Sequence, residues 1–184
     1  LAQQEKALSA SLASGDSKIG TGQVSFTFGS VKDGAFAADA DLPTQSVTIT
    51  SENNTLSGLR DAVNKAGIGV TASLVNDGNG SRLVFSSSRT GVEKAFKMEG
   101  VSTGSAPGEA ALSMFNYDPS TAPAHSPDST APGMVRLQAA KDAKILVDGL
   151  AVTKPDNLIT DAMDGLTITL TKVGKTQVTV SQDP

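Results

Sequence analysis

The sequence predicts an α+β fold that is mainly β, with two small antiparallel sheet-plus-short-helix domains preceded by a short N-terminal helix. The first observation is that apolar and polar residues alternate over several short segments, which is the period of a half-buried strand. The second is that the apolar residues change to helical spacing between some of these segments. The third is a set of Asp-Gly and Asn-Gly steps, which favour tight hairpin turns.

Residues 1–15 are predicted to be a helical leg or hinge segment. Leu1, Leu8 and Leu12 recur at spacings that place them near one helical face, and Gly15 ends the pattern. A helix this short is marginal by itself in water, so we expect it to continue upstream or to pack on another surface.

Residues 16–100 are predicted to form a first β-rich domain with the order strand, strand, helix, strand, strand. The evidence is four alternating segments, and a further short strand is expected near residues 95–98. The apolar positions that define the four strands are Val24, Phe26, Phe28, Val47, Ile49, Val70, Ala72, Leu74, Leu83 and Phe85. Residues 76–80, between the last two of these strands, are predicted to form a hairpin turn.

The helix of this domain is predicted over residues 54–67. The residues that share its apolar face are Leu56, Leu59, Val63 and Ala66. Asn53 or Asn54 is expected to accept the first free amides as the N-terminal cap, and Gly67 to supply the left-handed exit.

Residues 101–134 are predicted to be a Pro/Ser/Ala-rich linker with little regular structure, because prolines recur in it among Ser, Thr, Ala and Gly. Met114, Phe115 and Tyr117 are the exception, and we expect them to pin this segment to a neighbouring surface.

Residues 135–184 are predicted to form a second β-rich domain. Its expected elements are a strand over residues 145–147, a turn at 148–149, a brief helix over 158–163, and strands over 166–170 and 178–180. Because this order repeats that of the first domain, the pattern indicates a degenerate internal repeat. Strands near residues 20–30 could instead pair with those near Val178, which would make the second domain discontinuous.

The composition excludes several classes of protein. The chain has no Cys, so it has no disulfide, thiolate nucleophile or Cys-based zinc site. A net charge of -4 provides no basic field for nucleic acid. No apolar run approaches the roughly 20 residues needed to span a membrane, and the first 15 residues are too polar for a signal-peptide core. We expect no cofactor and no metal.

No catalytic site is predicted. The single histidine, His125, lies in a Pro-rich loop, where nothing is expected to hold a general base in place. Asp39 with Asp41, and Asp161 with Asp164, are possible carboxylate pairs for glycosidase-type chemistry, but solvated surface carboxylates are the favoured reading. The protein is therefore predicted not to be an enzyme.

Three short motifs lack features of the ligand-binding loops that they resemble: residues 77–81 and 174–176 are interpreted as turns, and residues 20–22 precede a strand. Residues 77–81 lack the Gly and the Glu that a calcium loop requires at its sixth and twelfth positions. Residues 174–176 lack the upstream Gly and the following helix of a phosphate-binding loop, and residues 20–22 lack the third Gly of a dinucleotide loop. Four threonines could form either the solvent-exposed face of a sheet or a flat polar contact between subunits: Thr167, Thr169, Thr171 and Thr179.

Residues 47–91 resemble the hook IN repeat of flagellar axial proteins. The resemblance rests on Asn54-Thr55-Leu56, on residues 59–64, and on residues 69–73, with Val63-Asn64 in the place of the usual Ile-Asn pair. Residues 139–149, 156–159 and 164–170 resemble the segment before the C-terminal helical leg in the hook-associated protein 2 family, the filament caps.

This resemblance implies a structural cap at the tip of the bacterial flagellar filament, and hence an extracellular location. It implies a ring-shaped homo-oligomer that promotes flagellin folding and polymerisation and prevents flagellin leakage. The partners expected on this basis are the protein itself, flagellin and, in an adhesive role, host mucin or glycan, but neither nucleic acid nor membrane. The partner-binding residues are not predicted.

Alternative functions remain open from the sequence. A hook–filament junction protein, or a flagellin with a decorated outer domain, belongs to the same system. A flagellum-borne adhesin is a different class, and a flagellum-borne hydrolase is disfavoured because the chain lacks a nucleophile and base in one constellation.

Overall fold

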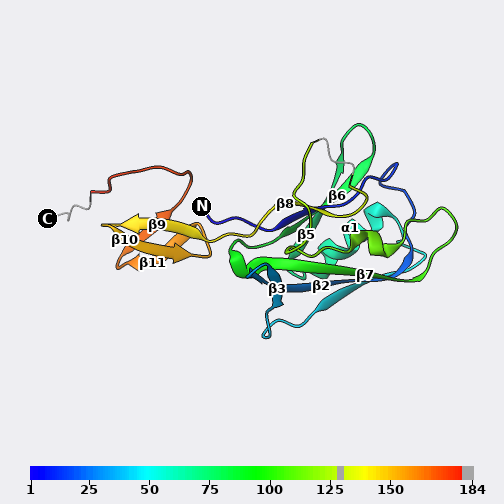
Figure 1. Cartoon of the computed structure of the whole chain (residues 1–184), viewed down its shortest axis with the longest axis horizontal. Helices are drawn as coiled ribbons and strands as arrows, with labels where there is room; N and C mark the ends of the chain where they lie inside the picture. The colour runs from blue at the N-terminus through cyan, green and yellow to red at the C-terminus, as the bar shows by residue number, and fades with distance from the viewer. Residues whose placement is uncertain (128–130, 180–184) are drawn as a thin grey trace.

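The computed structural model describes residues 1–127 and 131–179. Figure 1 shows a larger body that contains most of the strands and, beside it, two hairpins formed by the C-terminal strands. The N-terminus lies next to these hairpins, where Ala2 is hydrogen-bonded to Asn157.

One sheet of the larger body is antiparallel and has the strand order β5–β6–β1–β8. Its strands are β5 (Val70–Asn76), β6 (Ser81–Ser87), β1 (Lys6–Leu8) and β8 (Val135–Gln138). The predicted turn over residues 76–80 is confirmed: the Gly78 N–H donates to Asn76 Oδ1 at 2.8 Å, and the Asn79 N–H donates to Asp77 Oδ1 at 2.9 Å.

The second sheet is built around the long strand β2 (Thr21–Lys32). Strand β7 (Ala95–Gly104) pairs along one edge of β2, while β4 (Gln45–Ile49) and β3 (Ala35–Ala38) share the other edge. Val24 and Phe26 are buried between more exposed neighbours, as their alternation predicts. The strand predicted over residues 95–98 is present and extends further, to Gly104.

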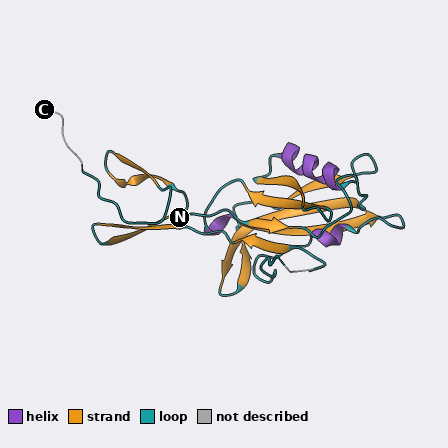
Figure 2. Ribbon diagram, turned by 90° about the horizontal axis from the view of Figure 1, so that it is seen from above, coloured by secondary structure: helices purple, strands orange, loops and turns teal. Residues whose placement is uncertain are grey.

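The single α-helix among the described residues, α1 (Leu56–Ala66), packs on β5 and β4 and closes one side of the larger body (Figure 2). Leu56, Leu59 and Val63 form its buried face and Gly67 ends it with φ 60°, as predicted, whereas Ala66, which was expected on the same face, is exposed. The N-terminal cap is Thr55, whose side chain accepts from the Gly58 N–H, so the prediction of Asn53 or Asn54 is wrong.

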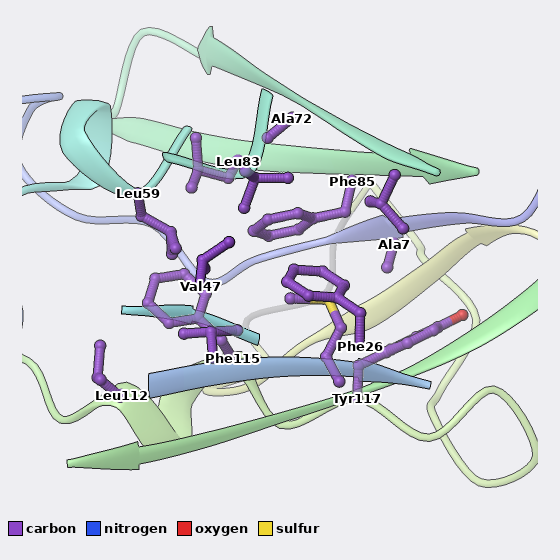
Figure 3. Close-up of a cluster of buried hydrophobic side chains, with 14 of the residues drawn as sticks. Ala7, Phe26, Val47, Leu59, Ala72, Leu83, Phe85, Leu112, Phe115 and Tyr117 are labelled. Carbon is purple, nitrogen blue, oxygen red and sulfur yellow. The ribbon is translucent and has the colours of Figure 1, made fainter. Parts of the chain in front are cut away.

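Aromatic rings from both sheets meet in one core (Figure 3). The ring centroids of Phe26 on β2 and Phe85 on β6 are 6.1 Å apart, and the Phe85 and Phe115 rings meet edge to face at 6.2 Å. Burial of each such side chain stabilises the fold by about 1.5–3 kcal/mol. The two sheets and α1 therefore share a single core.

The segment predicted to be a linker joins this core. It contains a short 3₁₀ turn, η2 (Leu112–Phe115), and Phe115 and Tyr117 are buried while Met114 packs against the core. The expectation that these residues anchor the segment is therefore confirmed. The division of the chain at residues 100 and 134 stays a prediction.

The C-terminal strands form two separate hairpins. Strands β9 (Ala143–Val147) and β10 (Leu150–Lys154) make the first, and β11 (Leu158–Met163) and β12 (Leu166–Thr169) make the second. The predicted turn at Asp148-Gly149 is confirmed, with both residues at positive φ. These are the orange hairpins in Figure 1.

The predicted N-terminal helix is wrong, because residues 1–14 are extended. Strand β1 lies between β6 and β8, and bridges at Gln3 and Leu12 prolong the pairing. Insertion into a sheet gives the backbone N–H and C=O groups of this segment hydrogen-bond partners on both sides. A short helix is marginal in water and could not compete with this pairing. The spacing of Leu8 and Leu12 alone could not reveal this, since four residues fit both a helix and a strand.

The helix predicted over residues 158–163 is also wrong, because this segment is strand β11. Asp164-Gly165 forms the turn between β11 and β12. The internal repeat loses its defining helix and is therefore wrong as well. The pairing suggested between residues 20–30 and Val178 is not seen: β2 pairs with β3, β4 and β7, and Val178 is exposed. Val178 and Thr179 have no regular structure, so the strand predicted over residues 178–180 is wrong for these two residues, and Val180 lies outside the described residues.

Candidate interaction surfaces

The residues considered for catalysis lie apart and make ordinary surface contacts. His125 is exposed, and its backbone N–H donates to the Arg136 carbonyl beside β8. Asp39 Oδ1 accepts from the Asp41 N–H at 2.9 Å, so these two aspartates form an exposed turn. Within residues 1–127 and 131–179 no group of three or more His, Cys, Asp and Glu side chains is placed to hold a metal ion.

The second carboxylate pair is likewise explained by local contacts. Asp161 forms an ion pair with Lys154 at 2.7 Å, and the hydrogen bond from that lysine lowers the pKa of the carboxyl. Asp164 lies exposed in the turn between β11 and β12. Both carboxylates are exposed, so neither has the buried surroundings that a general acid needs.

The predicted turn motifs carry no ligand geometry. Asp77 pairs with Arg82 at 2.9 Å across the base of the β5–β6 hairpin. Residues 174–176 lie in a stretch without regular structure, and Gly20 and Gly22 flank the start of β2. In the part of the chain that the structure describes, no helix is long and apolar enough to cross a membrane.

The outer face of the β2 sheet includes a row of hydroxyl groups between β2 and the β4 edge. Ser25 and Ser46 form a hydrogen bond of 2.9 Å between β2 and β4, and Thr27 and Thr44 form one of 2.8 Å. An open depression of about 530 Å³ continues this face at residues 21–23, 48–51, 101 and 103. Glu99 and Lys97 of β7 lie opposite Ser25 and Thr27 on the same face, so the face carries charges beside its hydroxyl groups. Such a polar face is suited to a contact with another polar protein surface. The threonines considered for this role in the sequence are also exposed: Thr167, Thr169, Thr171 and Thr179.

The C-terminal hairpins and the segment that follows them carry the most exposed large apolar side chains of the described chain. Leu146 is 74% exposed, Leu150 72% and Val173 86%. Leu146 and Leu150 belong to opposite faces of the β9–β10 hairpin, because side chains alternate along a strand. A hairpin that exposes a large apolar side chain on each face is a candidate for contact with another protein segment, and we call residues 143–179 the hairpin surface.

Buried polar groups join the hairpin region to the core. The Tyr117 hydroxyl donates to Glu5 Oε1, and the Ala140 N–H donates to Glu5 Oε2 at 2.8 Å. Burial raises the pKa of Glu5, and burial together with the charge of Glu5 raises the pKa of Tyr117. The Glu5 carboxyl thereby connects β1, the segment after η2 and the chain leading into β9.

Comparisons with known proteins identify the family to which this chain belongs. The family model described as "Flagellin hook IN motif" matches residues 39–89, and the one described as "Flagellar hook-associated protein 2 C-terminus" matches residues 140–184. The crystal structure of FliD (HAP2) from Pseudomonas aeruginosa PAO1 matches with a TM-score of 0.80 and 34% identity, over 100% of this chain and 77% of that one. The chain belongs to the flagellar hook-associated protein 2 family.

Other members of the family agree with this placement. The B-type flagellar hook-associated protein 2 of P. aeruginosa is 42% identical over 151 residues, which cover 79% of this chain and 31% of that protein. The D2-D3 domains of the flagellar cap protein FliD from Escherichia coli match with a TM-score of 0.71 and 28% identity, over 96% of this chain and 79% of that one. The family is a structural one of the bacterial flagellum and not a family of enzymes.

The chain spans less than a third of the length of the curated relatives that it matches: 31% of the P. aeruginosa protein and 22% of the E. coli K12 protein.

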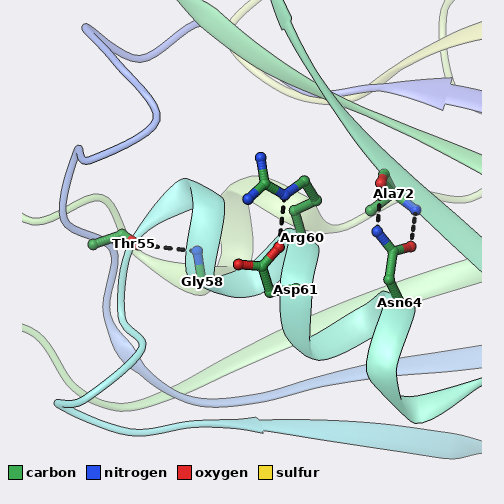
Figure 4. Close-up of polar contacts among 6 residues, drawn as sticks. All are labelled: Thr55, Gly58, Arg60, Asp61, Asn64 and Ala72. Atoms are coloured by element: carbon green, nitrogen blue, oxygen red, sulfur yellow. Dashed lines mark hydrogen bonds and ion pairs between the residues drawn. The ribbon is translucent and has the colours of Figure 1, made fainter.

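The hook IN segment contains β4, α1, β5 and β6. In Figure 4, α1 carries the Thr55–Gly58 cap, an Arg60–Asp61 ion pair of 2.8 Å and a double hydrogen bond from Asn64 to Ala72.

Sequence reasoning did not find two asparagine contacts. Asn64 binds both backbone groups of Ala72, and Asn157 binds both backbone groups of Ala2. The place of Asn64 in the hook IN pair singles it out, but nothing in the sequence says what it binds. Asn157 directly precedes the segment that was wrongly predicted to be a helix, and its partner Ala2 lies 155 residues away.

Proposed function

We propose that this chain is the head portion of the cap at the tip of a bacterial flagellar filament. In the assembled organelle it associates with further copies of itself and promotes flagellin folding and polymerisation, which prevents flagellin loss. The observation that carries the proposal is the match along the whole chain to the P. aeruginosa FliD (HAP2) structure, with a TM-score of 0.80.

Two physical features support a role in assembly. The larger body has one continuous aromatic core, which gives it the rigidity that a plate at a filament tip requires. The hairpin surface and the hydroxyl face of the β2 sheet lie outside this core and remain available for contacts. The hairpin surface is the stronger candidate, because its exposed apolar area gains most from being covered.

The test is complementation with the full-length protein that carries this chain. Cells that lack the gene and secrete flagellin are supplied with the protein, filaments are counted by electron microscopy, and flagellin in the medium is measured. We expect filaments to regrow and flagellin loss to stop. Persistent loss, with the protein bound along the sides or base of existing filaments, would contradict the cap function and support a junction role. Retention on immobilised mucin without restored growth would support an adhesin.

A pair of matched variants tests the hairpin surface within this function. Leu146→Ser with Leu150→Ser removes two exposed apolar side chains from the hairpins, and Val31→Ser with Leu42→Ser removes two from the larger body. We expect the first pair to reduce filament growth and the second to leave it near the wild-type level. Equal effects of the two pairs would show that the hairpin surface has no special role.

A further inference from the structure

The asparagine side chains of this protein are restrained by hydrogen bonds, with one exception. Six of the seven use the side-chain amide to bind backbone groups: Asn53, Asn54, Asn64, Asn76, Asn116 and Asn157. The seventh, Asn79, is exposed, and within residues 1–127 and 131–179 its side chain makes no hydrogen bond. The Asn79 carboxamide is therefore free to turn toward its own backbone.

Asn79 is also the asparagine that precedes a glycine, whereas each of the other six precedes a residue with a side chain. Because Gly80 has no Cβ, its backbone nitrogen can be approached closely. In the turn between β5 and β6 only backbone groups of this pair are tied: the Asn79 N–H donates to Asp77 Oδ1 at 2.9 Å, and the Gly80 carbonyl accepts from the Asp77 N–H at 3.1 Å. The free carboxamide and the least hindered backbone nitrogen thus belong to the same peptide bond.

We propose that Asn79-Gly80 is a site of spontaneous deamidation, at which water converts the asparagine into aspartate and isoaspartate. The Gly80 nitrogen attacks Asn79 Cγ and gives its proton to solvent, the Cγ–Nδ2 bond breaks, and the leaving nitrogen takes a proton from solvent to become ammonia. The product is a cyclic imide. Water then breaks one of the two bonds from the Gly80 nitrogen to an imide carbonyl carbon: the bond to Cγ, which gives aspartate, or the bond to the Asn79 main-chain carbon, which gives isoaspartate. One water is consumed and one ammonia is released.

The isoaspartyl product alters the backbone next to a strand pairing. Gly80 lies against the N-terminal segment, since a Cβ on Gly80 would be 2.4 Å from the Leu12 carbonyl oxygen. The next residue, Ser81, exchanges two backbone hydrogen bonds with Leu12, of 2.9 and 2.7 Å. Isoaspartate adds a methylene group to the main chain just before Gly80, so it displaces this pairing, whereas aspartate adds only a charge. This chemistry belongs to the folded chain and does not depend on the function at the filament tip.

The test is incubation of the folded 184-residue chain at mildly alkaline pH, followed by peptide mapping with mass spectrometry. Deamidation replaces an amino group by a hydroxyl and raises the mass accordingly, and chromatography separates isoaspartyl from aspartyl peptides. We expect the peptide with Asn79 to be converted while the peptides with the other asparagines keep their amides. Asn79→Gln is the matched control, because its longer side chain would have to close a larger ring, and we expect no conversion at this position over the same time.

A parallel sample in urea separates the effect of the fold from that of the sequence. If Asn79 is converted in urea but not in the folded chain, the turn protects it and the proposal is overturned. Conversion of another asparagine as fast as Asn79 in the folded chain would also overturn it, because the free carboxamide would then not select the site.

Hydrogen exchange tests the structural consequence by comparing the isolated isoaspartyl form with Asn79→Asp, which carries the same charge on an unaltered main chain. We expect faster exchange of the Leu12 and Ser81 amides in the isoaspartyl form alone. Equal exchange in the two forms would show that the added methylene group does not disturb the pairing, and would overturn that part of the proposal.

Discussion

At the scale of single residues, Glu5 is the most constrained ionisable group in the chain. It is 1% exposed and accepts from both Tyr117 and the Ala140 N–H. Burial raises its pKa despite these donors, because desolvation of the carboxylate outweighs the hydrogen bonds to it. The folded state therefore favours the protonated form of Glu5 more than the unfolded state does.

Glu5→Gln tests this at pH 4 to 8. A raised folded pKa gives a contribution to stability that is complete below the unfolded value, near 4.5, and is lost as pH rises through the folded pKa. We expect the free energy of unfolding of the native chain to fall relative to that of Glu5→Gln as pH rises above this value. Urea unfolding at each pH measures it. The exposed Glu52→Gln serves as control, and an identical pH dependence of Glu5→Gln and the native chain would contradict the argument.

At the scale of elements, the sequence predicts those in which local pattern and tertiary contacts agree. The alternation of Val24 and Phe26 and the helical spacing of Leu56, Leu59 and Val63 both match the faces that are buried. The helix predicted over residues 1–15 is wrong because pairing with β6 and β8, and not the leucine spacing, decides the conformation of this segment. The helix predicted over residues 158–163 is wrong because the Asp-Gly step that follows can end a helix or form a hairpin turn equally well.

The sequence predicts which types of residue could form the interaction surfaces, but not which of these residues contact one another. The threonine rows are visible in the sequence, but the pairing of Ser25 with Ser46 and of Thr27 with Thr44 requires the register of β2 on β4. The contact of Asn157 with Ala2 joins the two ends of the chain, which no local pattern can indicate. Side-chain amide contacts over such separations are properties of the folded chain.

In helix α1, replacement of Gly58 by alanine is expected to lower stability, although such replacements in helices usually raise it. Gly58 lies in its first turn, and replacement of a helical glycine by alanine commonly stabilises a protein by up to about 1 kcal/mol. Here a Cβ would lie 2.0 Å from the Asn53 carbonyl oxygen, which belongs to the backbone. We expect Gly58→Ala to destabilise the chain by about 1–3 kcal/mol in denaturant unfolding. The neighbouring Ser57→Ala is the control, and a stabilised Gly58→Ala variant would contradict this geometry.

At the scale of the whole molecule, the two parts of the chain have unequal internal support. The larger body holds nearly all of the buried apolar residues, whereas the hairpins β9–β10 and β11–β12 contribute only Ala143 and Ile159 to those described. Two-stranded hairpins are marginal without a surface to pack on. The hairpins are instead held by polar contacts: Asn157 with Ala2, and the Thr90 hydroxyl with the Pro155 carbonyl at 2.7 Å. We therefore expect them to open without unfolding of the larger body.

Asn157→Ala tests this independence of the two parts. It removes both side-chain bonds to Ala2, and loss of part-buried hydrogen bonds worth about 1–3 kcal/mol corresponds to roughly 5- to 150-fold faster local opening. We expect faster amide exchange in β11 and β12, and unchanged exchange in β2 and β6. Asn79→Ala, in the exposed β5–β6 turn, should leave the hairpins unaffected. If Asn157→Ala accelerates exchange equally in all strands, the hairpins and the larger body unfold as one cooperative unit, and the hairpin surface cannot move separately when it meets a partner.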